Sequence, residues 1–291
     1  MLTNVERFWI TYRELNLKLG AAIVGLCMTL ASVRVGCAER LESYRCGSVV
    51  EDAKCFLRSV LSYGALGRQP QQLPTALEAI IGQPVVISAK AFRTFLVTHR
   101  VDEGSLGGMI SEPLSKTRRG DFADYFVIHD TSTPTYANHQ EFPAFIDEAW
   151  WNQKLLQSLV RRKNAHVFID RTGQSKTSVN FASPLSTTLF EKMAEGSRRG
   201  LFLGVELIQP RKLDLQGIDA IAPLPGFTEA QLDRLALTYL AASIRRGRWM
   251  IPAFHAAIDA GFYNAHDDPQ NFDLNQWAQR LQILLAAILK Q

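Results

Sequence analysis

Two histidines and one carboxylate, far apart in the chain, are the residues whose types and order best suit metal chemistry. His129 follows the apolar run 125–128, His255 follows a second apolar stretch, and Asp268 precedes a proline. Imidazole and carboxylate groups are ligands that zinc accepts. Three protein ligands leave a fourth position for water, which a hydrolytic metal site needs. The set is therefore a candidate zinc site.

A glutamate and a further histidine stand in neighbouring apolar runs. Glu206 interrupts the run 201–208, and His166 lies at the start of the run 165–170. A carboxylate buried in a strand has a raised pKa, which suits proton transfer near neutral pH. An outward-facing strand position is the alternative for Glu206.

Cysteine chemistry is excluded from most of the chain. All four cysteines lie within the first 55 residues, at positions 27, 37, 46 and 55. A metal site beyond residue 55 must therefore use nitrogen and oxygen ligands. If residues 1–38 are removed on export, Cys46 and Cys55 remain and can form one disulfide.

The N-terminal segment 1–38 is typical of an export signal. Its uncharged apolar run, 19–33, is shorter than the roughly 20 residues that span a bilayer and matches a signal-peptide core. Small residues predict cleavage after Ala38. The alternatives are an uncleaved anchor or a lipoprotein acylated at Cys37, although Arg34 disfavours the latter. We expect an exported, periplasmic or envelope-associated protein without a stable membrane span in its mature form.

Charge and composition argue against a nucleic-acid partner. The 291 residues carry a formal net charge of +4, and 47% are hydrophobic. The predicted signal contains four basic and two acidic residues, which leaves +2 for the remainder. No basic stripe with interleaved aromatic residues is present.

Strand and helix patterns alternate from residue 117 onward. Strands are expected within 125–128, 165–170 and 201–208, and helices within 145–160, from the capping box at Thr228 to about 245, and within 275–289. This alternation predicts an α/β domain over 117–291, with a central sheet. Residues 39–116 are expected to form a small, mostly helical accessory region.

Five short segments, in this order, resemble the zinc-dependent N-acetylmuramoyl-L-alanine amidases of the type 2 amidase and peptidoglycan-recognition superfamily. They are Phe126–Ser132, Asn164–Gln174, Gly204–Leu207, Phe227–Leu232, and His255 together with Asp268–Asp273. The resemblance implies a central mixed β-sheet flanked by helices. It also implies hydrolysis of the amide between N-acetylmuramic acid and L-alanine in peptidoglycan or its muropeptide fragments.

The resemblance also assigns roles to single residues. It implies that His129, His255 and Asp268 are the ligands of a zinc ion, Zn²⁺, and that Glu206 acts as the general base and general acid. His166 is a candidate substrate contact, although packing beneath the site is the reading that we favour for it.

Two departures from the family pattern concern the last ligand. Thirteen positions separate His255 from Asp268, a longer gap than in several family members, so Asp267 is an alternative ligand. Two residues before the ligand Asp the family often has a lysine, whereas this chain has His266. A protonated histidine can still donate to a developing oxyanion, so His266 is a candidate catalytic helper.

Tyr136 and His139 follow the first ligand on a loop and are candidates for lining the substrate groove. Two other functions remain open for the same residues. One is a non-catalytic module that binds peptidoglycan, which need not keep both histidines, the aspartate and the glutamate. The other is a secreted effector amidase directed at a competitor's wall.

Overall fold

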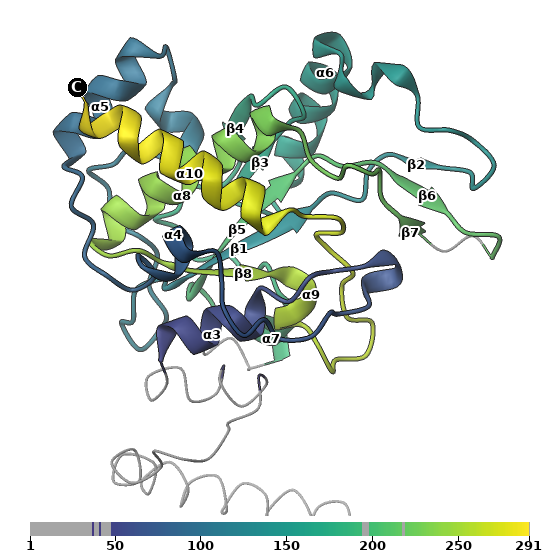
Figure 1. Ribbon diagram of the computed structural model, residues 1–291, viewed down its shortest axis with the longest axis horizontal. Coiled ribbons are helices and arrows are strands. Elements are labelled where there is room, and N and C mark those ends of the chain that lie inside the picture. Colours follow the sequence, from purple (N-terminus) through teal and green to yellow (C-terminus); the bar gives the residue numbers. More distant parts are fainter. Residues whose placement is uncertain (1–36, 38–40, 42–47, 194–197, 217–218, 291) are drawn as a thin grey trace, which may run out of the picture. The chain divides into compact units, whose positions relative to one another are not determined.

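The computed structural model describes Cys37, Leu41 and residues 48–193, 198–216 and 219–290 (Figure 1). Residues 48–291 form one compact unit, separate from residues 1–47. The boundary expected near residue 117 lies inside this unit. The predicted signal lies outside the described residues apart from Cys37, and so does Cys46. Cys37 and Cys55 are each disulfide-bonded.

A five-stranded sheet forms the centre of the unit, in the order β4-β3-β5-β1-β8. Its strands are β1 (Tyr125–Asp130), β3 (Val167–Ile169), β4 (Ser175–Thr177), β5 (Phe202–Leu207) and β8 (Ile251–Phe254). β1 pairs in parallel with β5 and β8, and β5 pairs in parallel with β3, whereas β4 is antiparallel to β3. The sheet is therefore mixed, in agreement with the expected α/β class.

Helices cover both faces of this sheet. Figure 1 shows α8 (Glu229–Arg246) and α10 (Leu274–Leu289) on one side, and α3 (Val49–Phe56) with α9 (His255–Ile258) on the other. Strands covered on both faces read as continuous apolar runs, because neither set of side chains reaches water. Every residue of β1, β3 and β8 is accordingly buried.

The long helix α8 begins at the capping box expected from the sequence. The Thr228 hydroxyl accepts a hydrogen bond from the Gln231 amide at 3.1 Å, and the Gln231 side chain accepts from the Thr228 amide at 3.2 Å. The helix ends at Gly247, whose φ of 77° is left-handed. Packing of Tyr239 on Trp277, with ring centroids 5.3 Å apart, joins α8 to α10.

Short helices separated by turns and loops make up the described part of the expected accessory region, which is less helical than expected. It contains α3, a short 3-10 helix η1 (Ser62–Gly64), α4 (Thr75–Glu78), α5 (Ala89–Thr98) and a second 3-10 helix η2 (Glu103–Leu106). α3 packs against β8, α4 and α5 pack against α10, and η2 packs beside β4. These segments therefore share the core of the sheet domain.

A second, three-stranded sheet was not expected from the sequence. Its order is β2-β6-β7, with β2 (Thr135–Tyr136), β6 (Arg211–Leu213) and β7 (Asp219–Ile221). Strands of two or three residues are too short to show an alternating pattern. The remaining elements are η3 (Ala144–Asp147), α6 (Ala149–Leu159), η4 (Val160–Arg162) and α7 (Leu189–Met193).

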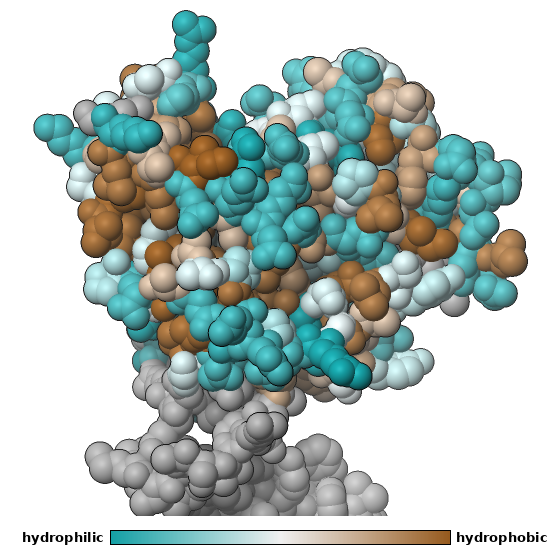
Figure 2. Space-filling model, viewed as in Figure 1, coloured by the Kyte–Doolittle hydropathy of each residue, from teal (hydrophilic) through white to brown (hydrophobic). Residues whose placement is uncertain are grey.

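Among the described residues, none of the helices has the length and hydrophobicity needed to cross a bilayer. Figure 2 shows hydrophilic and hydrophobic residues interspersed over the face that carries α10. Hydrophobic residues gather at the left of this view.

Replacing Thr228 with alanine should destabilise the domain by about 1–2 kcal/mol, because the α8 amide loses its side-chain acceptor. Thr228→Ser keeps the hydroxyl and should stay close to wild type. Urea unfolding followed by circular dichroism measures both variants. Equal destabilisation by serine and alanine would attribute the effect to the threonine methyl group rather than to the cap.

Candidate metal centre

The carboxyl ends of three strands bring the candidate residues together. In the parallel register of β1 and β5, His129 lies opposite Glu206. Residues paired in this way point to the same face of a sheet. β8, on the other side of β1, ends at Phe254, so His255 begins α9 at the same edge. Open α/β sheets commonly place their sites at this edge.

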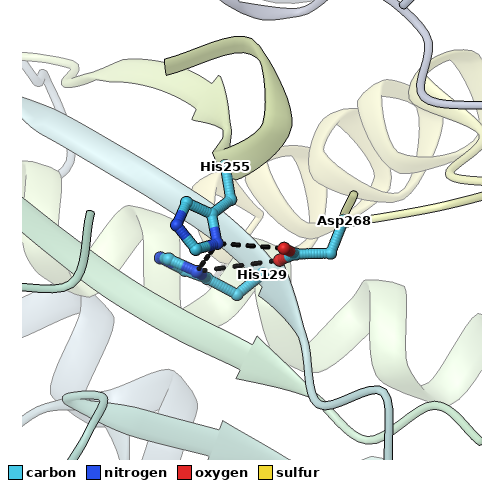
Figure 3. A group of neighbouring side chains, drawn as sticks. All are labelled: His129, His255 and Asp268. Atoms are coloured by element: carbon cyan, nitrogen blue, oxygen red, sulfur yellow. Dashed lines mark hydrogen bonds and ion pairs between the residues drawn. The ribbon is translucent and has the colours of Figure 1, made fainter. Parts of the chain in front are cut away.

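His129, His255 and Asp268 form a compact cluster (Figure 3). The two Nδ1 atoms lie 2.8 Å apart, and both rings turn these atoms toward Asp268. The Asp268 carboxylate lies 2.9 Å from His255 Nδ1 and 3.7 Å from His129 Nδ1. All three side chains are buried, with residue exposures of 2–4%.

Backbone hydrogen bonds hold Asp268 beside the two histidines. The Asp130 amide, one residue after His129, donates to Asp268 Oδ2 at 3.0 Å. The Ala256 amide, one residue after His255, donates to the Asp268 carbonyl at 2.8 Å. The segment that carries Asp268 is thereby fixed to the residues that directly follow both histidines.

Asp267 faces away from this cluster. Its carboxylate accepts hydrogen bonds from Arg211 Nη1 at 3.1 Å and from Gln270 Nε2 at 2.7 Å. Arg211 is fully buried and also donates to Asp130 at 2.7 Å. Of the two adjacent aspartates left open by the sequence, Asp268 is the one that joins the histidines.

In the absence of a metal ion, the cluster contains one neutral ring, one protonated ring and one ionised carboxylate. Burial, aided by His255, holds the pKa of His129 well below its ordinary value, so this ring is neutral. Burial also lowers the pKa of His255, but Asp268 and Asp259 outweigh it and raise the value to about 10. His255 in turn outweighs the burial of Asp268 and lowers its pKa to about 2. The ionised carboxylate thus faces the cluster's positive charge.

A metal ion fits this arrangement. One atom from each of the three residues lies within 4.8 Å of the other two, and the donor set is two imidazole nitrogens and one carboxylate oxygen. These residues could hold a divalent cation.

Glu206 lies beside the cluster, as its pairing with His129 requires. Its Oε2 atom is buried and has no hydrogen-bond partner. Burial, followed by the negative charge of Asp268, raises the pKa of Glu206 well above its ordinary value. A carboxyl group in this state can accept and return a proton.

His266 and Asp259 extend the site beyond the three-residue cluster. The His266 ring stacks on His255, with centroids 3.8 Å apart, and its Nδ1 lies 2.7 Å from Asp259 Oδ2. The same Asp259 oxygen lies 2.9 Å from His255 Nε2. Sequence reasoning missed Asp259, although its position four residues after His255 would have indicated a shared helix face.

His166 has a packing role. It is fully buried, its Nδ1 accepts from the Gly204 amide at 3.1 Å, and its Nε2 lies 3.2 Å from the Ser183 carbonyl. Burial lowers its pKa to about 4, so the ring is neutral. Both ring nitrogens are occupied, which agrees with the packing alternative and not with contact to substrate.

Tyr136 and His139 lie near the second sheet. Tyr136 is in β2 and packs edge-on against Phe142, with centroids 6.2 Å apart, and His139 is exposed. Among the described contacts, none joins either residue to the three-residue cluster.

A groove of about 880 Å³ does not include the cluster. It is lined by ten residues from the segment 57–75, by Phe254 and by residues 271–275. Phe254 directly precedes His255, and Asn271 follows Asp268 by three positions.

Comparison of the chain with protein-family models, curated proteins and solved structures found no match.

Alanine in place of His129, His255 or Asp268 should reduce bound metal from about one equivalent per chain to a trace, because each change removes one of three ligands. Asp267→Ala is the matched control and should keep its metal, since that carboxylate faces Arg211. Elemental analysis after dialysis against zinc decides this. Metal loss in Asp267→Ala alone would transfer the third ligand to Asp267.

Proposed function

We propose that this protein is a zinc-dependent amidase that cleaves the bond between N-acetylmuramic acid and L-alanine in peptidoglycan or muropeptides. The observation that carries the proposal is the buried His129–His255–Asp268 cluster with Glu206 on the adjacent strand. The ligand set suits zinc because it combines two imidazoles with one carboxylate and no thiol. The ordered resemblance of five segments to that amidase family supplies the substrate class.

The roles of the residues follow from their positions. Zinc, when bound, polarises the scissile carbonyl and lowers the pKa of a water molecule. Glu206 takes a proton from the attacking water and returns it to the leaving amine. Its raised pKa suits the second step, and the positive charge of His255 opposes part of that rise.

His266 is placed to assist at the carbonyl oxygen. Its side chain is 42% exposed, whereas the three cluster residues are almost fully buried. It therefore stands between solvent and the His255 ring on which it stacks. A protonated His266 donates a hydrogen bond to the negative charge that develops on the substrate oxygen.

The groove that includes Phe254 and Phe272 is our candidate for holding the remainder of a muropeptide. Its volume of about 880 Å³ lies within the range of about 300–1,000 Å³ typical of small-molecule sites. Its wall offers aromatic surface from Phe272 and hydrogen-bonding groups from Asn271, Asn275 and Gln72. Sugars and peptides need this combination of flat apolar surface and polar partners.

We also propose that the protein is exported, because its substrate class lies outside the inner membrane. Edman sequencing of the protein from a periplasmic extract should find Glu39 at the N-terminus. An intact Met1 in that fraction would rule out cleavage, and a lipid on Cys37 would identify a lipoprotein.

Glu206→Gln should lower kcat by about two to four powers of ten, because it removes the proton acceptor and keeps the shape of the side chain. Activity of the wild type should fall as the pH decreases through the Glu206 pKa, and this acid limb should move or vanish in the variant. The measurement is digestion of purified sacculi, with products identified by mass spectrometry.

Zinc content is the control for this variant, since Glu206 lies outside the ligand set and its replacement should leave the metal in place. Near-wild-type cleavage by a zinc-loaded Glu206→Gln protein would exclude Glu206 from the mechanism. A wild-type protein that holds zinc and binds sacculi, yet releases no peptide stems, would favour the non-catalytic binding module.

A further inference from the structure

Asp259 has four nitrogen neighbours and no exposure to solvent. Oδ1 accepts hydrogen bonds from the Leu189 and Phe190 amides at 2.9 and 3.3 Å. Oδ2 lies 2.9 Å from His255 Nε2 and 2.7 Å from His266 Nδ1. The residue is 0% exposed. One oxygen thus binds the backbone at the start of α7, and the other faces two imidazole rings.

We infer that Asp259 is a positioning residue that decides which nitrogen of His255 binds the metal. This inference rests on the proposed zinc site. The Asp259 carboxylate, 2.9 Å from His255 Nε2, favours the proton on that nitrogen by its charge, which leaves Nδ1 as the ligand atom directed at His129 and Asp268.

The tautomer of His255 follows from the hydrogen-bonding properties of the two groups. A neutral imidazole carries one N–H donor and one lone pair, and an ionised carboxylate only accepts. The carboxylate beside Nε2 therefore stabilises the tautomer with its proton on Nε2. The Nε2–Oδ2 contact is an ion pair at 2.9 Å whose angle departs from that of a straight hydrogen bond. The negative charge of Asp259 nevertheless stabilises a proton on His255 Nε2.

His255, Asp259 and His266 also lie close enough together to suggest a second metal position. Such a position would use His255 Nε2 as a ligand, so this nitrogen would carry no proton for the Asp259 carboxylate to attract. The two arrangements differ in stoichiometry. Asp259 as a positioning residue predicts one ion per chain, and Asp259 as a ligand predicts two.

Asp259→Asn tests the inference with little change of shape. The asparagine carbonyl can keep the two α7 amides, which places its NH₂ group against His255 Nε2. Two donors then face each other unless His255 moves its proton to Nδ1, where it blocks metal binding. Zinc affinity should fall by about 10- to 100-fold, as is usual when the partner of a ligand histidine is lost.

Two matched variants separate this effect from loss of charge or of His266. Asp267→Asn makes the same charge change on the neighbouring carboxylate, which faces Arg211. His266→Ala removes the other ring bound by Asp259 Oδ2. Both should keep zinc affinity close to wild type in a chelator competition assay. An affinity loss in Asp267→Asn equal to that in Asp259→Asn would overturn the inference.

Nitrogen-15 NMR of the zinc-loaded wild type tests the same point without any variant. The His255 Nε2 should retain its proton, and Nδ1 should show the shift of a metal ligand. Zinc on Nε2, two zinc ions per chain, or wild-type affinity in a folded Asp259→Asn protein would each contradict the inference.

The test of amidase activity is independent of the test of Asp259. A wild type that binds one zinc ion but leaves sacculi intact refutes the proposed activity, while the affinity and NMR results still judge Asp259. A wild type that binds no zinc refutes both proposals.

Discussion

β1 lies between β5 and β8, and the hydrogen-bonded register of these three strands decides which side chains meet at their carboxyl ends. Pairing of His129 with Glu206 puts a candidate ligand and a candidate base on one face. A shift of one residue would send Glu206 to the opposite face. Because these strands are buried on both sides, such a shift would also bury polar groups in the core, so the register is strongly fixed.

The buried charges around this edge are balanced in linked pairs. Asp130 is held by Arg211, Asp268 faces His255, and Asp259 faces the other side of the same ring. An unpaired charge at these depths would cost several kcal/mol. The pairs therefore restrict how each carboxylate can turn, and they keep Asp267 bound to Arg211 and away from the cluster. His255 has a carboxylate at each ring nitrogen, which leaves it little freedom to rotate.

The N-terminal segments also shape this edge. A Cβ atom at Gly64 would lie 2.7 Å from the Asp267 side chain, and Gly64 has a left-handed φ of 69°. The 3-10 helix η1 can approach the loop that carries the last ligand because glycine stands at this position. Ten residues of the segment 57–75 also line the groove that includes Phe254. A region expected to be accessory thus belongs to the same compact unit as the cluster.

Local sequence patterns determined the elements: apolar runs predicted β1 and β5, and the capping box at Thr228 predicted the start of α8. These signals depend on neighbours in the chain, so the α/β class and the candidate ligands could be read from them. The choice of Asp268 over Asp267, the packing role of His166 and the position of Asp259 depended on tertiary structure. Asp268 is selected by contacts of the buried Arg211 and of the β1 backbone, and His166 is held by Gly204 and Ser183, all far away in sequence. Asp259 lies four residues from His255, but the Leu189 and Phe190 amides that bind it belong to a distant segment, which no local pattern records.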